Sequence, residues 1–242
     1  MGVAKRTISE VKTTVEKLLL PPSPPFGAET EARLRRYGAL LLELNERVRL
    51  VGPRDETTLW NEHIADCLHL LPLLPKEGSV IDVGTGGGLP GAVLAMCRPD
   101  LSFTLLDSLS RKTNALAQIV SQLGIENARV VCARSEDFAA ENRETFSCAV
   151  VRAVAEAGII AEYLSPLVSP GGRLAAMKGS AVEGELAGPK GRWSELGLSE
   201  PSLYEYELNG HVSSMLIWEK TAPCPPAFPR RPGRAEKKNW WR

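Results

Sequence analysis

A run of glycines directly after a short apolar segment is the feature of this 242-residue chain that most clearly predicts chemistry. Residues 80–83 have the composition of a buried strand, and they lead into a turn that contains Gly84, Gly86, Gly88 and Gly91. Glycine lets the backbone pass close beneath a bound nucleotide, where a side chain would collide. The segment therefore predicts a nucleotide-type cofactor, and a tight turn without a ligand is the weaker interpretation.

Two acidic residues flank this loop in the expected sheet. Asp82 comes just before the loop, where it can attract the ammonium group of S-adenosylmethionine directly or through water. Asp107 ends the next apolar segment, at the position of an acid that accepts both hydroxyls of a ribose. Asp107 suits either NAD or S-adenosylmethionine, so it does not distinguish these two cofactors.

The register of the glycines does distinguish them. The spacing of residues 86, 88 and 91 matches the Gly-x-Gly-x-x-Gly pattern of NAD-binding proteins, which alone is weak evidence. A dinucleotide fingerprint should start where the strand ends, at Gly84, and in that register Leu89 stands at the third glycine. Asp82 would also repel a pyrophosphate. The loop therefore favours S-adenosylmethionine over NAD.

The elements that must position these residues alternate between strands and helices. Strands are predicted at residues 80–83, 102–106, 128–132, 146–151 and 173–177, with helices at 90–96, 111–123 and 156–168. Such alternation is typical of a parallel sheet covered on both faces. After a weaker helix at 182–196, strands at 203–208 and 212–218 flank Asn209-Gly210, a strong hairpin signal. We predict an α/β fold with a mostly parallel, seven-stranded sheet ending in an antiparallel hairpin.

The first 75 residues are expected to be helical. Helices are predicted at 7–20, 29–50 and 56–71, the last with Asp55 as its N-cap, and the proline-rich segment 21–25 is expected to be a linker. We therefore divide the chain into a helical N-terminal extension (1–75), a cofactor-binding domain (76–220) and a basic C-terminal tail (221–242).

The charge distribution indicates a polyanionic partner. Lys+Arg and Asp+Glu both number 29, yet residues 229–242 hold six basic residues and one acid. We expect this tail to be a flexible arm that binds RNA phosphates, with Trp240 and Trp241 stacking on exposed bases. A second basic pair lies near the loop. The predicted RNA-binding residues are Arg111, Lys112, Arg230, Arg231, Arg234, Lys237 and Lys238.

Composition argues against several other classes. The longest apolar stretch, 68–74, is too short to span a bilayer, and the N-terminus lacks the apolar core of a signal peptide. The five cysteines are scattered and form no Cys-x-x-Cys pair, which disfavours a disulfide framework or a zinc site. His63 and Asp66 share a helix face without an evident third metal ligand. We expect a cytoplasmic protein without a metal or a membrane anchor.

Several motifs resemble the class I methyltransferases and, more closely, the bacterial 16S rRNA guanine-N7 methyltransferase family, also called glucose-inhibited division protein B. The likeness runs from about residue 29 to the end. Its motifs are Trp60-x-x-His63-x-x-Asp66, the loop from Asp82 to Gly91, Leu105-Leu-Asp-Ser108 with Arg111-Lys112, Val151-Arg152-Ala153, Pro170-Gly-Gly-Arg173 through Met177-Lys-Gly179, and Pro229-Arg-Arg-Pro-Gly233.

The resemblance implies methylation of a guanosine N7 in 16S rRNA, free or in the small ribosomal subunit, by a protein that we expect to be a monomer. Matched motif by motif, it places cofactor contacts at Gly84, Leu89, Ser135, Glu136 and Arg152. With the residues of the loop, the expected cofactor-binding set is Asp82, Gly84, Gly86, Gly88, Leu89, Asp107, Ser135, Glu136 and Arg152. The chain has Val154 where the family usually has phenylalanine, and its ending at Trp240-Trp241-Arg242 is also unusual.

Methyl transfer to N7 needs alignment more than proton transfer, because this nitrogen bears a free in-plane lone pair. The catalytic candidates are Arg152 and Lys178, each at the carboxyl end of a strand, to position the cofactor, the guanosine or an RNA phosphate. Cys148 lies inside a strand and is expected to be a core residue rather than a nucleophile. A methyltransferase for a small molecule or protein, and an RNA-binding module without catalysis, remain alternatives.

Overall fold

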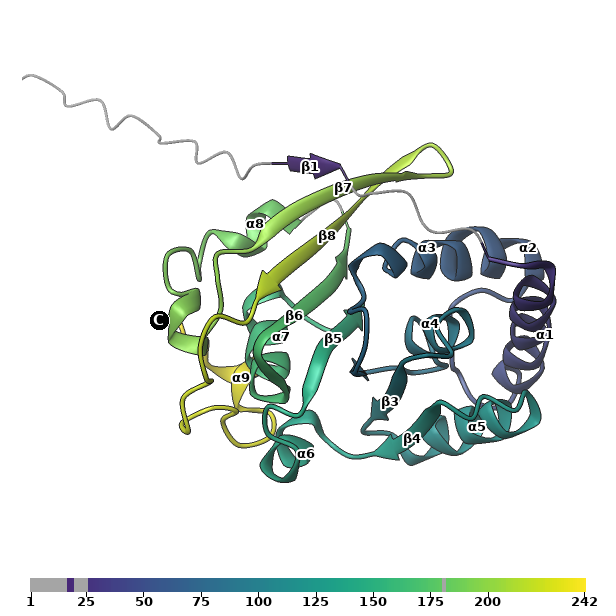
Figure 1. Cartoon of the computed structure of the whole chain (residues 1–242), viewed down its shortest axis with the longest axis horizontal. Helices are drawn as coiled ribbons and strands as arrows, with labels where there is room; N and C mark the ends of the chain where they lie inside the picture. The colour runs from purple at the N-terminus through teal and green to yellow at the C-terminus, as the bar shows by residue number, and fades with distance from the viewer. Residues whose placement is uncertain (1–16, 20–25, 180–181) are drawn as a thin grey trace, which may run out of the picture.

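The computed structural model describes residues 17–19, 26–179 and 182–242, and in this part of the chain eight strands form one sheet (Figure 1). The sheet order is β1-β7-β8-β6-β5-β2-β3-β4. The strands are β1 (Lys17–Leu19), β2 (Ser79–Val83), β3 (Ser102–Asp107), β4 (Ala128–Cys132), β5 (Phe146–Arg152), β6 (Val168–Lys178), β7 (Ser202–Leu208) and β8 (His211–Glu219). All seven predicted strands are present, and β1 adds an eighth.

The sheet is parallel from β6 to β4 and antiparallel at the hairpin of β7 and β8. Asn209 and Gly210 connect these two strands with φ values of 51° and 76°, the left-handed conformation that a tight hairpin turn requires. The predicted α/β fold and its terminal hairpin are therefore confirmed. Because β2, β3 and β5 are neighbouring parallel strands, their carboxyl ends lie at one edge of the sheet.

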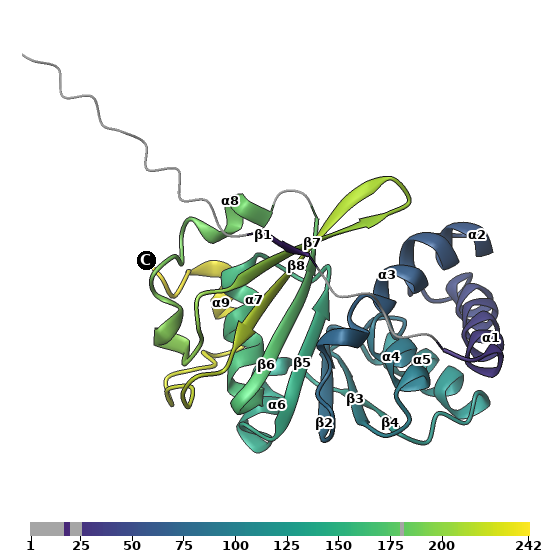
Figure 2. The ribbon, with the colours of Figure 1, turned by 45° about the horizontal axis from the view of Figure 1, so that its top comes forward.

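Two hydrophobic cores lie on the two faces of this sheet, and they account for the burial pattern of its strands. On β5, Cys148 and Val150 belong to one core, whereas Ala149 and Val151 belong to the other. Cys148 is fully buried, as expected for a core residue. Figure 2 shows α1, α4 and α5 gathered on one side of the strands and α7, α8 and α9 on the other.

The helices are short apart from two of them. They are α1 (Ala28–Asn45), α2 (Glu56–Thr58), α3 (Ala65–Leu68), α4 (Gly91–Cys97), α5 (Ser110–Gln122), α6 (Ser135–Glu141), α7 (Ala157–Leu164), α8 (Val182–Leu186) and α9 (Arg234–Lys237). Turns of 3-10 helix cover Leu71–Leu73, Ser165–Leu167 and Trp193–Leu196. Among the helices of the described residues, none combines the length and the apolar composition that a membrane-spanning segment requires.

The helix predicted at 29–50 ends five residues early, at Asn45. The Asn45 side chain accepts hydrogen bonds from the backbone N–H groups of Leu50 and Val51, at 2.7 and 3.0 Å, and donates one to the Pro53 carbonyl. The Asn45 side chain thus accepts the hydrogen bonds that backbone carbonyls would accept in a continuing helix. The residues after Asn45 therefore fold back into a loop.

The helix predicted at 56–71 is present from Glu56 to Leu68, as an uninterrupted run of α-helical and π-helical segments. Asp55 is its N-cap as expected, accepting a hydrogen bond from the Thr58 N–H at 2.8 Å. Residues Leu59–Ile64 then form a π-helical segment between α2 and α3. A π-helical segment changes the direction of side chains and is frequent at functional sites.

Other boundaries differ from the prediction where tertiary contacts decide them. Residues 17–19 of the helix predicted at 7–20 are instead β1, which pairs with β7. The rest of that helix and the linker 21–25 lie outside the described residues. Helix α6 was not predicted. The helix predicted at 156–168 is α7 followed by a 3-10 turn, and β6 begins at Val168. The weak helix predicted at 182–196 is replaced by α8 and a separate 3-10 turn.

Candidate methyl-donor and acceptor site

The glycine loop is held in place by the acid that precedes it. Asp82 is fully buried, and its Oδ2 accepts hydrogen bonds from the Thr85 hydroxyl at 2.6 Å and the Gly91 N–H at 2.8 Å. A Cβ on Gly91 would lie 2.7 Å from the Cβ of Asp82 and 2.4 Å from Leu105, so this position has room only for glycine. Helix α1 also supports the loop, because the Tyr37 hydroxyl donates to the Gly87 carbonyl at 2.9 Å.

The Asp82 carboxyl changes its protonation state near neutral pH. Burial, with a smaller contribution from nearby Asp107, raises the pKa of its carboxyl to about 7, against the lowering effect of the hydrogen bonds from Thr85 and Gly91. Its second oxygen, Oδ1, is buried and has no hydrogen-bond partner among the described residues. Asp82 lies beneath the loop and does not line the pocket at the carboxyl ends of the strands. It therefore affects that pocket through the shape of the loop and through its own charge.

Asp107 connects β3 to the glycine loop. Its Oδ2 accepts a hydrogen bond from the Gly86 N–H at 2.9 Å, and its Oδ1 accepts one from the Leu109 N–H at 2.9 Å. Asp107 is largely buried, yet it lines an open pocket at the carboxyl ends of the strands. Each carboxylate oxygen retains a second acceptor site, which is what binding of two ribose hydroxyls requires.

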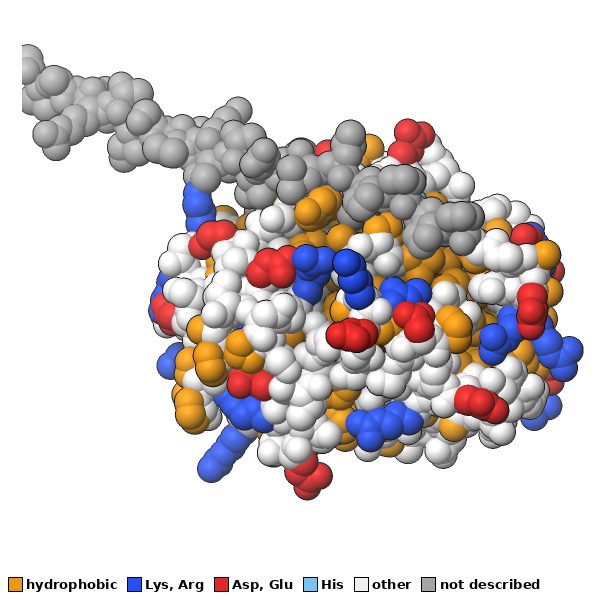
Figure 3. Space-filling model, viewed as in Figure 1, with side chains coloured by type: hydrophobic (Ala, Val, Ile, Leu, Met, Phe, Trp, Pro, Cys, Tyr) orange, Lys and Arg blue, Asp and Glu red, His pale blue; other side chains and the backbone are white. Residues whose placement is uncertain are grey.

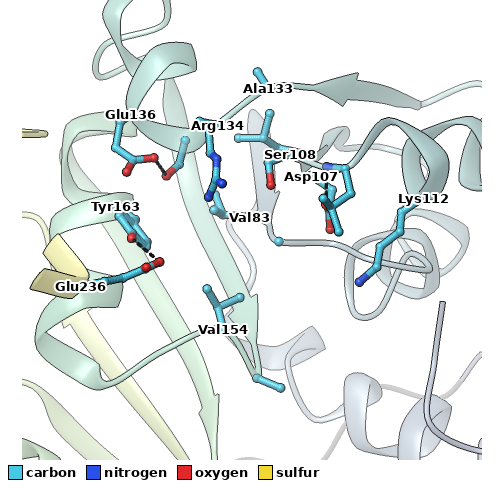
Figure 4. Close-up of a pocket in the computed structure, with 15 residues that line it drawn as sticks. Val83, Asp107, Ser108, Lys112, Ala133, Arg134, Glu136, Val154, Tyr163 and Glu236 are labelled. Carbon is cyan, nitrogen blue, oxygen red and sulfur yellow. Dashed lines mark hydrogen bonds between the residues drawn. The ribbon is translucent and has the colours of Figure 1, made fainter. Parts of the chain in front are cut away.

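This first pocket, which we name the donor pocket, brings four of the nine predicted cofactor residues together: Gly84, Asp107, Ser135 and Glu136. Gly84 lines this pocket with a φ of 75°, and a Cβ there would meet Val154 at 2.6 Å. Figure 4 shows Asp107 and Lys112 on one side of the pocket and Glu136, Tyr163 and Glu236 on the opposite side. Its lining residues are Val83, Gly84, Leu106–Leu109, Lys112, Ala133–Glu136, Ala153, Val154, Tyr163 and Glu236.

Three charged or aromatic lining residues were not predicted from the sequence: Arg134, Tyr163 and Glu236. Arg134 precedes the Ser135-Glu136 pair and could have been included for that reason. Tyr163 is on α7 and Glu236 on α9, and only the folded chain brings them to the pocket. Lys112, predicted to bind RNA, lines the donor pocket as well. Leu89, Gly86 and Gly88 are in the loop but do not line the pocket.

A second pocket, the acceptor pocket, adjoins the first. Its lining residues are Asp66, Arg152, Ala153, Met177, Lys178, Gly179, Glu185, Tyr206 and Ser213. Ala153 lines both pockets and has a φ of 53°, a left-handed conformation that is unusual for a residue other than glycine. The turn after β5 therefore separates the two pockets, and it is held in a strained conformation.

Arg152 organises the wall of the acceptor pocket. Its guanidinium donates to the carbonyl of His63 at 3.1 Å, lies 2.6 Å from His63 Nδ1, and has Nε 3.5 Å from Asp66 Oδ2. The other oxygen of Asp66 accepts a hydrogen bond from the Tyr206 hydroxyl at 2.6 Å. The π-helical segment thus turns the carbonyl and ring of His63 toward the end of β5, and joins motifs that are almost 90 residues apart.

Lys178 holds the turn after β5 from the opposite side. Its Nζ lies 2.6 Å from Glu185 Oε2 and donates to the carbonyl of Ala155 at 2.9 Å. The same Glu185 oxygen accepts a hydrogen bond from the Ala157 N–H at 2.7 Å, at the start of α7. The Lys178 ammonium is therefore already paired within the protein, with a carboxylate and a backbone carbonyl.

The C-terminal tail is not the flexible arm that its composition predicts. Trp240 and Trp241 are buried in one of the two cores, so neither is available to stack on a base. The Trp240 indole donates to the Gly158 carbonyl at 2.8 Å, and the Trp241 ring lies so close to Gly158 that a Cβ there would meet it at 2.2 Å. Burial of two indoles stabilises the packed tail, because aromatic side chains remove large apolar areas from water.

Arg230 also packs inside the protein rather than facing a partner. Its guanidinium binds Glu162, a residue of α7 that is almost fully buried, at 2.7 and 2.6 Å. The other predicted RNA-binding residues of the tail, Arg231, Arg234, Lys237 and Lys238, are exposed, as is Arg111 at the start of α5. On the face drawn in Figure 3, basic side chains are interspersed with acidic ones rather than forming one continuous patch.

A mostly parallel sheet with a glycine loop after its β2 strand, and a pocket at its carboxyl edge, defines a class I methyltransferase fold. A solved structure of a Klebsiella pneumoniae protein assigned as an O-methyltransferase has the same fold. It aligns with a TM-score of 0.53 and 13% sequence identity, and covers 82% of this chain and 92% of its own.

Within that class the chain belongs to the rRNA small subunit methyltransferase G family (GidB), whose model matches residues 30–209. The ribosomal RNA small subunit methyltransferase G of Moorella thermoacetica is 37% identical over 216 residues, which are 87% of this chain and 90% of that protein. The protein of the same name from a Nocardioides species is 37% identical over 222 residues, covering 88% and 87%. The family expected from the sequence motifs is confirmed.

Proposed function

We propose that this protein transfers a methyl group from S-adenosylmethionine to N7 of a guanosine in 16S rRNA. The observation that carries the proposal is the meeting of two pockets at Ala153, one built on the glycine loop and one on Arg152. Methyl transfer needs two ligands that approach each other in line, and two pockets that share one wall are suited to hold them.

The residues of the donor pocket fit S-adenosylmethionine. Asp107 offers acceptors for ribose hydroxyls, the loop from Gly84 leaves its backbone uncovered, and the ionised form of Asp82 supplies negative charge beneath the loop. When bound, S-adenosylmethionine supplies a methyl group activated by a sulfonium. Gly84, Asp107, Ser135 and Glu136 would hold this cofactor, with Asp82, Gly86, Gly88 and Leu89 shaping the loop that carries them.

The acceptor pocket suits a nucleophile that needs no deprotonation. Each of its acids is already bound: Asp66 to Tyr206 and Arg152, and Glu185 to Lys178 and Ala157. Burial, and then the Arg152 charge, lower the pKa of His63, whose Nδ1 lies against that guanidinium. Guanine N7 has a free lone pair and requires no base, whereas an exocyclic amine would have to lose a proton during the reaction.

In this proposal Arg152 orients the guanosine, and Lys178 maintains the turn between the pockets. Arg111, Lys112 and the exposed basic residues of the tail contact RNA phosphates. We further propose that the protein acts as a monomer in the cytoplasm, on free 16S rRNA or on the small subunit. These roles rest on the family and on the arrangement of charge.

Transfer of tritium from methyl-labelled S-adenosylmethionine tests this function. The acceptors are 16S rRNA and small subunits from cells that lack the protein, with rRNA from wild-type cells as the already methylated control. We expect incorporation into the first set and little into the control. Cofactor binding without incorporation into either form of RNA would favour an RNA-binding module, and incorporation into protein or small molecules would favour the other alternative.

A further inference from the structure

The C-terminal segment, residues 229–242, reaches the donor pocket through one side chain, that of Glu236. Glu236, on α9, lines the pocket opposite Asp107, and its Oε1 accepts a hydrogen bond from the Tyr163 hydroxyl at 3.3 Å (Figure 4). Tyr163 lines the same pocket from α7. A carboxylate from the last residues of the chain therefore faces the place where the cofactor is proposed to bind.

The position of Glu236 is fixed by contacts on both sides of it in the sequence. Before it, Arg230 binds Glu162 through two charged hydrogen bonds, and the Gly233 N–H donates to Glu136 Oε1 at 3.1 Å. After it, the Trp240 indole is anchored on the Gly158 carbonyl. Because Glu136 is itself a pocket residue, the segment is attached directly to the pocket as well as to the core.

The chemistry of Glu236 is that of a hydrogen-bond acceptor. Burial, together with nearby carboxylates, raises the pKa of Tyr163, so its hydroxyl stays protonated and donates to Glu236. A carboxylate has about four acceptor sites, and this hydrogen bond uses one of them. An adenosyl group presents an exocyclic amine and ribose hydroxyls, all of which can donate.

We propose that Glu236 is a cofactor-binding residue, and that it accepts a hydrogen bond from the adenosyl group of the methyl donor. The inference rests on the proposed function, since it takes S-adenosylmethionine as the ligand of this pocket. It assigns to the C-terminal segment a role in holding the cofactor, in addition to any contact that its exposed basic residues make with RNA.

Calorimetry on the full-length chain tests this role. The ligands are S-adenosylmethionine and its demethylated product, S-adenosylhomocysteine, which keeps the adenosyl group but lacks the sulfonium charge. We expect Glu236→Ala to weaken both by about tenfold or more, as loss of a charged hydrogen bond does, and Glu236→Gln to weaken both by less, because its amide oxygen still accepts. The matched control is Glu141→Ala, which removes an exposed glutamate at the end of α6, outside the pocket.

Kinetic and thermal measurements separate cofactor binding from a structural role. We expect Glu236→Ala to raise the KM for the cofactor more than it lowers kcat. The thermal midpoint of the ligand-free protein should stay close to that of the wild type, because the Glu236 side chain is exposed. Equal affinity of Glu236→Ala and wild type for both ligands would overturn the proposal. A loss confined to S-adenosylmethionine would also overturn it, since Glu236 would then act on the sulfonium charge. Failure of the wild type to bind either ligand would instead overturn the proposed function.

Discussion

The guanidinium of Arg152 lies 2.6 Å from Nδ1 of His63, and this contact joins the end of β5 to the π-helical segment. A guanidinium can only donate, so His63 Nδ1 is the acceptor and its ring is neutral with the proton on Nε2. The lowered pKa of His63, caused by burial and by the Arg152 charge, agrees with this state. One side chain thus fixes both the wall of the acceptor pocket and the tautomer of a neighbouring ring.

Replacement of Arg152 by alanine should reduce methyl transfer to rRNA by on the order of a hundredfold, because the acceptor wall loses the group that positions it. Affinity for S-adenosylmethionine should change much less, since Arg152 lines only the acceptor pocket. Rates and calorimetric affinities measure the two effects. Arg173→Ala is the control, because Arg173 pairs with Glu219 and lines neither pocket. Full activity of Arg152→Ala would contradict the assignment.

Affinity for S-adenosylmethionine should increase as the pH rises through 7. Burial raises the pKa of Asp82 to about 7, so its carboxyl gains its negative charge in this range and then attracts the cationic cofactor. Calorimetry at several pH values measures this trend, and Asp82→Asn should abolish the part that belongs to Asp82. An unchanged pH profile in Asp82→Asn would show that the charge of Asp82 plays no part.

The same pKa shift affects the stability of the ligand-free protein in the opposite direction. Since the folded-state pKa lies above that of the unfolded chain, the free energy of unfolding should fall as the pH rises from about 4 through 7. Denaturant unfolding across this range measures the slope. Asp82→Asn should flatten it, because asparagine keeps the acceptor for Thr85 and Gly91 but does not titrate. A slope of equal size in both proteins would contradict the shift.

Gly91→Ala should destabilise the protein by about 1–3 kcal/mol, because the added methyl group would collide with Asp82 and Leu105 under the glycine loop. Denaturant unfolding measures this change. The control is Gly184→Ala on α8, where a Cβ meets nothing within 4 Å, and where alanine should stabilise by up to about 1 kcal/mol through helix propensity. Equal stability of the two variants would show that the loop has room for a side chain.

The exposed basic residues of the tail can be tested without disturbing its buried half. Changing Arg231, Arg234, Lys237 and Lys238 together to glutamine should weaken binding to rRNA. It should also reduce the slope of log K against log salt by about 0.7–0.9 for each phosphate that the variant no longer neutralises. The thermal midpoint should stay near that of the wild type, because these side chains are exposed. An unchanged salt slope would remove the tail from the RNA-binding surface.

Most of the sheet could be predicted from the sequence because local pattern and tertiary structure agree there. The strands at 80–83 and 128–132 are short and apolar and are bounded by turn residues, and Asn209-Gly210 needs only local geometry to form its hairpin. Strand β1 could not be predicted in this way. Its three residues are extended because β7, far away in the sequence, offers a partner.

The sequence predicted the residues that the glycine loop and the strand ends contribute to the donor pocket, but it did not predict Glu236 from the C-terminal segment. Asp82, Gly84 and Asp107 lie at strand ends, whose common edge follows from a parallel sheet. Glu236 reaches the pocket because the segment is anchored on both sides of it, by Arg230 and Gly233 before it and by Trp240 and Trp241 after it. Basic residues, prolines and glycine are as typical of a flexible, solvent-exposed arm as of a packed segment, so the composition of the tail does not distinguish the two. The absent side chain of Gly158, which makes room for Trp241, is a signal that only the folded structure explains.

Identification of the modified nucleoside is the most direct test of the central claim. The protein is incubated with methyl-labelled S-adenosylmethionine and 16S rRNA from cells that lack it, and the RNA is then digested to nucleosides and separated by chromatography against standards. The two-pocket arrangement with Arg152 at the acceptor predicts label in 7-methylguanosine alone. Label in a nucleoside methylated on carbon or on an exocyclic amine, with none in 7-methylguanosine, would contradict it.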